Sequence, residues 1–249
     1  MVNRIKGLLR SRPLLYDLAI PVKRALGWKT PSYDFFNQFS QMHNRSVNFI
    51  QIGANDGLRN DPIREFVVRD GWAGIFVEPL PEVFTQLKKN YHRVRASHLV
   101  FVNAAISRSN SESISFWTFD DRFLAALPFE KRMWYLRKSS ISKDRLKKVV
   151  RASPSFDQVI KEVKVPCMTL SYLVQKYWVG GRINLLVIDA EGHESAILTS
   201  MDFEVLNPDA IFFESLHLGR DKNKVFDFLS KNTYTVSEVH GDAIACRKG

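Results

Sequence analysis

The sequence predicts an α/β protein built on a mostly parallel sheet, and three observations support this fold class. Short apolar runs alternate with segments of helical apolar spacing over most of the chain from residue 46 onward. The first run leads directly into a turn that carries Gly53 and Gly57. Near the end of the sequence, two apolar runs flank Gly241-Asp242, which predicts an antiparallel hairpin.

The expected elements alternate along the chain, which favours parallel strands joined by right-handed helical crossovers. Strands are predicted at 47–52, 75–78, 99–102, 183–188, 210–213, 233–240 and 243–247. Helices are predicted where apolar residues recur three or four positions apart, around 63–67, 83–91, 170–177, 197–201 and 225–229.

Residues 107–165 interrupt this alternation, and we treat them as a helical insertion between the third and fourth strands. Within it, 114–118 is predicted as an extra strand and 129–151 as one or two basic helices. Long structured insertions near the active edge of a sheet often cover a site or bind substrate. We therefore expect one domain over residues 46–249, with this insertion as a lid or substrate-binding element.

The composition is that of a folded protein with one large domain. The chain has 249 residues, of which 45% are hydrophobic. Cys167 and Cys246 lie far apart without metal-ligand spacing, which indicates a reducing compartment and no disulfide framework. The apolar run 13–22 contains Asp17 and two prolines, so it is too short and too interrupted to span a membrane. We expect a cytoplasmic protein.

The net charge of +10 is concentrated in two basic clusters. The first lies in residues 1–45, a basic N-terminal extension with helical spacing that we expect over one edge of the sheet. It contains Arg4, Lys6, Arg10, Arg12, Lys23, Arg24 and Lys29. The second contains Lys131, Arg132, Arg137, Lys138, Lys143, Arg145, Lys147, Lys148 and Arg151. Such clusters favour anionic partners, although a solvated basic face without a specific partner explains them equally well.

Ligands of open α/β sheets bind beyond the carboxyl ends of the parallel strands. In this sequence those ends fall at 53–57, 78, 103–104, 189–194 and 214–217. Gly53 and Gly57 would let the main chain approach a ligand, and Glu78 could accept hydrogen bonds from a ribose diol. Purely structural roles are the alternative, because Asp56 could cap the next helix and Glu194 could lie on a solvated helical face.

Four short blocks carry a resemblance to a known family. They are Gln51-Ile52-Gly53-Ala54-Asn55-Asp56-Gly57, Val77-Glu78-Pro79, Val165-Pro166-Cys167-Met168-Thr169-Leu170 and Val187-Ile188-Asp189-Ala190-Glu191-Gly192-His193-Glu194. Together they resemble the signature blocks of FkbM-type S-adenosylmethionine-dependent methyltransferases, over about residues 47–217. The resemblance implies a class I methyltransferase (Rossmann-like) fold of seven strands, the last antiparallel, and O-methylation, commonly of sugar or polyketide hydroxyls.

The resemblance also implies which residues contact the cofactor S-adenosylmethionine. They are Gly53, Asn55, Asp56, Gly57, Glu78, Asn103, Ala104 and Asp189. The glycine loop would approach the methionine part, Glu78 would hold the ribose hydroxyls, and Asn103 with Ala104 would border the adenine. Asp189 would face the cofactor amine or the transferring methyl. The general pattern has an acid where this chain has Gln51, and Asp56 is the candidate for the missing charge.

Methyl transfer to a hydroxyl requires an aligned acceptor oxygen and a way to remove its proton. His193 is the first candidate for the base and His217 the second, because a neutral imidazole is available at cellular pH. Alternatively, Asp189, Glu191 and Glu214 could hold Mg²⁺, which prefers oxygen ligands and would acidify the hydroxyl. Asp189 and Glu191 are therefore catalytic candidates in either scheme.

We predict an S-adenosylmethionine-dependent O-methyltransferase that acts on a sugar or glycan hydroxyl, in a surface polysaccharide, a glycolipid or a glycosylated metabolite. A non-sugar natural product is the alternative acceptor, and a non-catalytic binding module is the alternative function. A dinucleotide oxidoreductase is disfavoured because the loop 53–57 lacks Gly-x-Gly-x-x-Gly spacing.

The expected partner is a hydroxylated glycan, anionic or lipid-linked, with peripheral membrane contact through the basic N-terminus. A nucleic acid is disfavoured as a partner. The segment Asp189-Ala190-Glu191-Gly192 offers neither the proline nor the aromatic platform that holds a flipped base.

Overall fold

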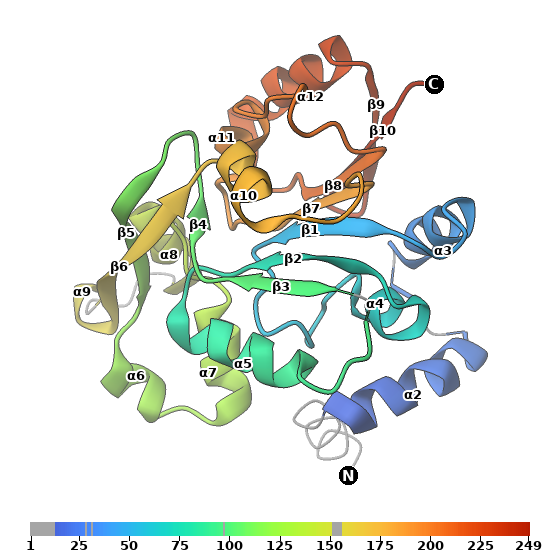
Figure 1. Ribbon diagram of the computed structural model, residues 1–249. Helices are drawn as coiled ribbons and strands as arrows, with labels where there is room; N and C mark the ends of the chain where they lie inside the picture. Colours follow the sequence, from blue (N-terminus) through green and yellow to red (C-terminus); the bar gives the residue numbers. More distant parts are fainter. Residues whose placement is uncertain (1–12, 28, 31, 97, 151–155) are drawn as a thin grey trace.

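A twisted sheet forms the centre of the protein, and helices cover both of its faces (Figure 1). The structure is a computed structural model that describes residues 13–27, 29–30, 32–96, 98–150 and 156–249. Within these residues the sheet has seven strands: β1 (Asn48–Ile52), β2 (Ala73–Val77), β3 (Leu99–Val102), β7 (Leu185–Ile188), β8 (Ala210–Glu214), β9 (Tyr234–Val239) and β10 (Asp242–Arg247). The basic residues Arg4, Lys6, Arg10, Arg12 and Arg151 lie outside the described part.

The strand order is β3-β2-β1-β7-β8-β10-β9. The pairs β1–β2, β2–β3, β1–β7 and β7–β8 are parallel, whereas β10 is antiparallel to both β8 and β9. The predicted fold class and the closing hairpin are thereby confirmed. The strand order reverses between β1 and β7, which is the position where sheets of this kind bind their ligands.

One face of the sheet is covered by α3 (Tyr33–Met42), α4 (Arg64–Asp70) and α5 (Pro81–Tyr91). Aromatic side chains dominate this layer, and the ring centroids of Phe36 and Phe212 lie 4.9 Å apart. The sequence suggests that the N-terminal extension covers an edge of the sheet. In the structure α3 instead covers a face, because its helical spacing places Phe36 and Phe39 together on the aromatic layer of the sheet.

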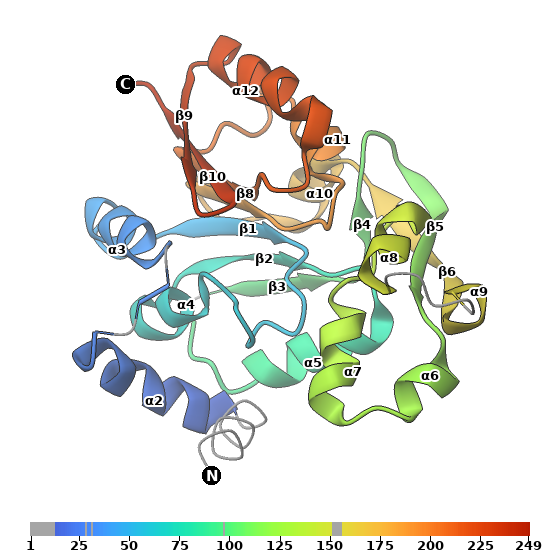
Figure 2. The same cartoon turned by 180° about the vertical axis from the view of Figure 1, so that it is seen from behind.

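The opposite face is covered by α10 (Leu170–Tyr177), α11 (Glu194–Leu198) and α12 (Lys222–Lys231), as the view from behind also shows (Figure 2). A short 3-10 turn, Gly219–Asp221, precedes α12. The central strands are buried on both faces, so β2 and β7 consist of uninterrupted buried residues rather than an alternation.

The insertion folds around its own core beside the carboxyl edge of the main sheet (Figures 1 and 2). It holds β5 (Ser111–Phe119), α6 (Asp121–Ala125), α7 (Phe129–Leu136), α8 (Lys143–Val150), α9 (Phe156–Val159) and β6 (Ile160–Met168), and β6 also pairs with β4 (Ala105–Ile106). The extra strand and the basic helices are where the sequence predicts them. The strand β6 and the helix α6 are additional.

The first described helix, α2 (Pro13–Ala25), lies on the outer side of α4 (Figure 1). Two ion pairs join these helices, Asp17 to Arg64 and Arg24 to Glu65. No helix in the described part of the chain is long and apolar enough to cross a membrane.

Candidate active site

The turns that follow β1 and β7 are in direct main-chain contact. Gly53 has a φ of +73°, and a Cβ atom at this residue would lie 1.8 Å from the carbonyl oxygen of Asp189. The glycine is therefore required by the neighbouring loop, a reason that the sequence argument for close approach to a ligand does not contain. Gly57 is similar, because a Cβ there would lie 2.5 Å from the side chains of Leu87 and Tyr91.

Glu78 at the end of β2 is held by main-chain donors. The amide of Asn55 donates to its Oε2 at 3.0 Å and the amide of Leu80 donates to its Oε1 at 3.0 Å. Burial raises the pKa of Glu78 to about 7, and the charges of Asp189 and Asp56 add to this although the two amides oppose it. The carboxyl group thus joins two loops and still lines a cavity.

Two cavities open at this edge of the sheet. The first, of about 50 Å³, has mainly apolar walls from Pro79, Leu80, Ala104, Phe116 and neighbouring residues, with Glu78 and His193 among them. The second, of about 420 Å³, has polar walls that include Gln51, Asn60, Lys138, Glu214 and Asp242. Gly53, Asn55, Arg137, Asp189 and Glu191 line both cavities. The shared residues place Asp189 where the two cavities meet.

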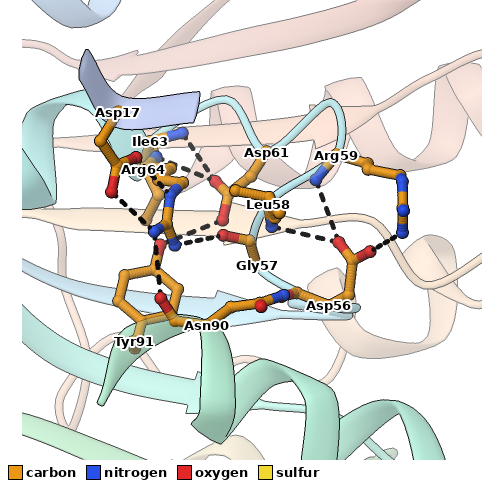
Figure 3. Close-up of polar contacts among 10 residues, drawn as sticks. All are labelled: Asp17, Asp56, Gly57, Leu58, Arg59, Asp61, Ile63, Arg64, Asn90 and Tyr91. Carbon is orange, nitrogen blue, oxygen red and sulfur yellow. Dashed lines mark hydrogen bonds and ion pairs between the residues drawn. The ribbon is translucent and has the colours of Figure 1, made fainter. Parts of the chain in front are cut away.

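Asp56, a predicted cofactor residue, lines neither of these two cavities. Its carboxylate accepts hydrogen bonds from the amides of Leu58 and Arg59 and pairs with the Arg59 guanidinium at 2.7 Å (Figure 3). The side chain of Asn103 also points away from the cavities, because its side-chain amide donates to the carbonyl oxygens of Glu78 and Pro79. Both side chains shape the loops rather than the cavity walls.

Arg64, which sequence reasoning does not single out, supports the glycine loop from behind (Figure 3). It is almost fully buried and donates to the carbonyl oxygen of Gly57 at 2.9 Å, while Asp17 accepts two of its hydrogen bonds. Its guanidinium also lies over the Tyr91 ring, 4.7 Å from the centroid. An arginine at the start of a helix gives no sequence signal for such a role, because its partners lie on other elements.

Acidic side chains are concentrated around Asp189. Asp189 keeps an exposed surface where it lines both cavities, yet the surrounding loops desolvate its carboxyl group and, with the charges of Glu191 and Glu194, raise its pKa to about 7. Burial, together with Asp189, raises the pKa of Glu214 to about 8. Burial also raises the pKa of Asp242, at the start of β10, to about 6. Proximity of like charges in a poorly solvated site favours the protonated forms.

Two residues of this group are committed to internal contacts. Glu191 pairs with Lys138 at 2.5 Å and with Arg145 at 2.9 Å, both from the basic part of the insertion. Glu194 is fully buried and accepts hydrogen bonds from the amides of Ala190 and Gly192. The solvated position suggested for Glu194 is therefore wrong, since it ties down the turn after β7.

The predicted magnesium ligands do not form one cluster. In the described part of the chain, potential ligand atoms gather within 4.8 Å in two groups, Glu191-Glu214-His217 and Asp189-Glu194-Glu214. Lys138 and Arg145 already neutralise Glu191, and Arg145 also contacts His217, so the first group does not fit a divalent cation. In the second group Glu194 is occupied by main-chain donors.

The two candidate bases differ in their surroundings. His193 lines the first cavity, and its Nε2 is hydrogen-bonded to Ser107 Oγ at 2.9 Å. Burial and the charge of Arg108 lower the pKa of His193, so the ring is neutral at neutral pH. Burial and Arg145 likewise lower the pKa of His217. Arg145 can only donate, so the lone pair on Nε2 of His217 is already engaged.

Gln51 marks where the chain departs from the general pattern. The residue is 4% exposed, lines the second cavity, and its Oε1 atom has no hydrogen-bond partner among the described residues. A buried acceptor without a partner is costly, by about 1–3 kcal/mol. A bound donor in the cavity would satisfy it, as the amino group of an amino-acid-like ligand could.

The profile of the methyltransferase FkbM domain matches residues 51–236. No curated protein matches the sequence. Among solved structures, the chain is similar to a methyltransferase FkbM from Methylobacillus flagellatus KT, with 10% identity and a TM-score of 0.48 over 81% of this chain. The match covers 44% of that longer protein.

Two further structures of comparable length are similar. A magnesium protoporphyrin IX methyltransferase from Synechocystis PCC 6803 with bound SAM has 8% identity and a TM-score of 0.44, over 94% of this chain and 83% of that one. A methyltransferase from Pyrococcus furiosus has 13% identity and a TM-score of 0.43, over 96% of this chain and 98% of that one.

Proposed function

The chain belongs to the methyltransferase FkbM domain family, and from this premise we propose that it transfers a methyl group from S-adenosylmethionine to a hydroxyl of a sugar or glycan. The observation that carries the proposal is the position of Asp189 between two cavities of different character. A narrow apolar cavity suits a nucleoside, and a wider polar one suits a hydroxylated acceptor.

The chain's own residues fit the cofactor. We assign the adenosine part to the cavity beside Glu78 and Ala104, and the methionine part to the junction near Asn55, Asp189 and the unpaired Gln51 oxygen. The carboxylates there favour a cationic ligand.

When bound, the cofactor supplies an electrophilic methyl group on a positively charged sulfur. The protein must then bring the acceptor oxygen into line and accept its proton. His193 is neutral, lines the cofactor cavity and is oriented by Ser107. We assign it the role of base, with Asp189 as the group that positions the reactants at the junction.

A sugar acceptor is supported by the wall of the second cavity. Trp134 of α7 is 44% exposed and lines this cavity together with carboxyl, amide and basic side chains. The apolar face of a sugar ring can pack on an indole, while its hydroxyls bond to the polar groups around it. An entirely aromatic or aliphatic acceptor would leave those polar groups unsatisfied.

The test uses the full chain, S-adenosylmethionine with an isotopically labelled methyl group, and a panel of glycans beside hydroxylated non-sugar compounds. Label should appear in a glycan hydroxyl, and Trp134→Ala should raise the acceptor KM about tenfold, a loss of about 1.4 kcal/mol, without changing cofactor affinity. Tyr172→Ala removes an exposed aromatic ring outside both cavities and is the control. Label only in non-sugar hydroxyls would overturn the acceptor class, and absence of cofactor binding in calorimetry would overturn methyl transfer itself.

A further inference from the structure

The helix α2 exposes a row of apolar side chains. Leu14, Leu18 and Val22 of the helix and Leu26 just beyond its end follow one another at intervals of four residues and are 49%, 72%, 60% and 68% exposed. Residues spaced in this way lie on one side of a helix. A continuous exposed apolar surface is uncommon on a protein that meets only water, and it marks an interaction site.

The orientation of α2 is fixed by polar residues that point inward. Asp17 pairs with the buried Arg64 at 2.8 Å, and Arg24 pairs with Glu65 at 2.9 Å. The side chain of Asp17 is only 14% exposed, whereas Leu18 beside it is 72% exposed. The helix thus has the reverse of the usual polarity, with its ion pairs against the protein and its leucines outward. Rotating the leucines inward would break both ion pairs.

Cations surround this apolar row. A groove of about 800 Å³ is lined by Leu14, Leu18 and Pro21 of α2 together with Lys89, Arg93 and Arg95 at and beyond the end of α5. These three basic side chains are exposed, and no ion pair within the described residues engages them. In the sequence, the twelve residues before Pro13 contain Arg4, Lys6, Arg10 and Arg12 and no acid.

The other basic cluster is less available. Lys138 and Arg145 face Glu191 inside the site, and Lys143 and Lys147 pair with Asp157 and Asp144. Several charges of this part of the insertion are therefore neutralised by internal contacts, which weakens the expectation that it meets an anionic partner. The groove beside α2 is the better candidate.

We propose that α2 and the groove beside α5 form a docking surface for a membrane that contains anionic phospholipid. The apolar row enters the boundary between headgroups and acyl chains, and Lys89, Arg93 and Arg95 meet the lipid phosphates. Charge complementarity selects this partner, because the surface combines exposed apolar side chains with cations, the acid that lines the groove, Asp17, is paired with Arg64, and the whole chain carries a net charge of +10. The docking requires neither cofactor nor acceptor.

The test is flotation of the full chain with vesicles of phosphatidylcholine alone or of an equimolar mixture with phosphatidylglycerol. The wild type should float with the mixed vesicles, and added salt should weaken this binding by screening. Leu18→Asp and Val22→Asp should each lower partitioning at least about tenfold. Val179→Asp, at an exposed apolar residue away from α2, is the matched control and should leave it unchanged.

The contribution of charge is measured with Arg93→Glu and Arg95→Glu, against Lys224→Glu on the exposed side of α12 as control. Failure of the wild type to float with mixed vesicles overturns the proposal, as does equal binding by wild type and Leu18→Asp. Sedimentation without lipid provides a further check. If the wild type is a dimer there and Leu18→Asp is a monomer, a second copy covers the apolar row and the membrane is not its partner.

Discussion

Gly53 and Asp189 approach each other so closely that a Cβ atom on Gly53 would lie 1.8 Å from the Asp189 carbonyl oxygen. The amide of Gly53 donates to the carbonyl oxygen of Val77, and the amide of Asp189 donates to that of Ile52. Three strand ends are thus joined by main-chain contacts at the junction of the two cavities. The position of Asp189 depends on the absence of a side chain at residue 53.

Gly53→Ala should therefore damage both stability and cofactor binding. The control is Gly71→Ala, because Gly71 has nearly the same φ, +72°, but nothing lies within 4 Å of its added Cβ. Backbone strain alone should lower the free energy of unfolding by about 1–2 kcal/mol in Gly71→Ala. Gly53→Ala should lower the free energy of unfolding clearly more than this. It should also bind S-adenosylmethionine at least about tenfold more weakly, since Asp189 must move. Chemical denaturation and calorimetry measure the two effects, and equal behaviour of the two variants would contradict the proposed contact.

Glu214 should make the stability of the protein depend on pH. Its pKa is raised from 4.5 to about 8, so the folded state binds this proton more tightly than the unfolded state. The resulting stabilisation is complete below about pH 4.5 and is lost as the pH rises toward 8. Glu214→Gln mimics the protonated form, so the variant should keep this stabilisation at high pH.

The variant should therefore match the wild type at pH 5 and exceed it at pH 8, by about 1 kcal/mol or roughly 2–4 °C in Tm. Glu204→Gln, at an exposed loop position, is the control. A variant that is less stable than the wild type at pH 8 would mean that Lys138 and His217 stabilise the charged Glu214 carboxylate more than burial and the neighbouring acids oppose it.

The arrangement of strands could be predicted from the sequence because burial on both faces leaves continuous apolar runs such as those of β2 and β7. The strand β6 is less evident. Its charged positions Lys161, Glu162 and Lys164 interrupt the apolar pattern, and Pro166 argues against a strand. In the structure Pro166 falls where the β5–β6 register shifts, so the missing amide donor breaks no regular ladder.

The site could be predicted in part from the geometry of a parallel sheet. Parallel strands end at one edge, so Glu78, Asp189 and Glu214 come together as the strand-end rule expects. The partners of Glu191 could not be predicted, because Lys138 and Arg145 lie 53 and 46 residues away in an insertion with its own core. Sequence shows which charges exist, and only the fold shows which of them neutralise one another.

Cofactor binding should release protons near neutral pH. Glu78 and Asp189 each have a pKa of about 7, so both are partly protonated at pH 7. A cationic ligand at the junction favours their ionised forms. Calorimetry at pH 7 in buffers of different ionisation enthalpy should show an observed enthalpy that varies with the buffer. Asp189→Asn should reduce this dependence and the exposed Asp202→Asn should not, whereas no buffer dependence in the wild type would contradict the raised pKa values.

The identity of the base can be determined from the pH dependence of turnover. Burial lowers the pKa of His193 below its usual 6.5, so a rate that depends on its neutral form should rise with pH at a midpoint below 6.5 and be level at neutral pH. If Asp189 accepts the proton instead, the midpoint should lie near its pKa of about 7. His193→Gln should lower kcat by about 10²- to 10⁴-fold with cofactor affinity unchanged, and His98→Gln, at an exposed ring, is the control.

Two further variants separate a catalytic base from a structural contact. Ser107→Ala removes the hydrogen bond to His193 Nε2 and should lower kcat more modestly, by about tenfold, because the ring remains but is less well oriented. A chelator should leave turnover unchanged, since Lys138 and Arg145 take the place that a divalent cation would need beside Glu191. Full activity in His193→Gln, combined with a midpoint near 7, would transfer the role of base to Asp189. Loss of activity on chelation, restored by Mg²⁺, would show that the two cations move aside and that a metal ion acidifies the acceptor hydroxyl.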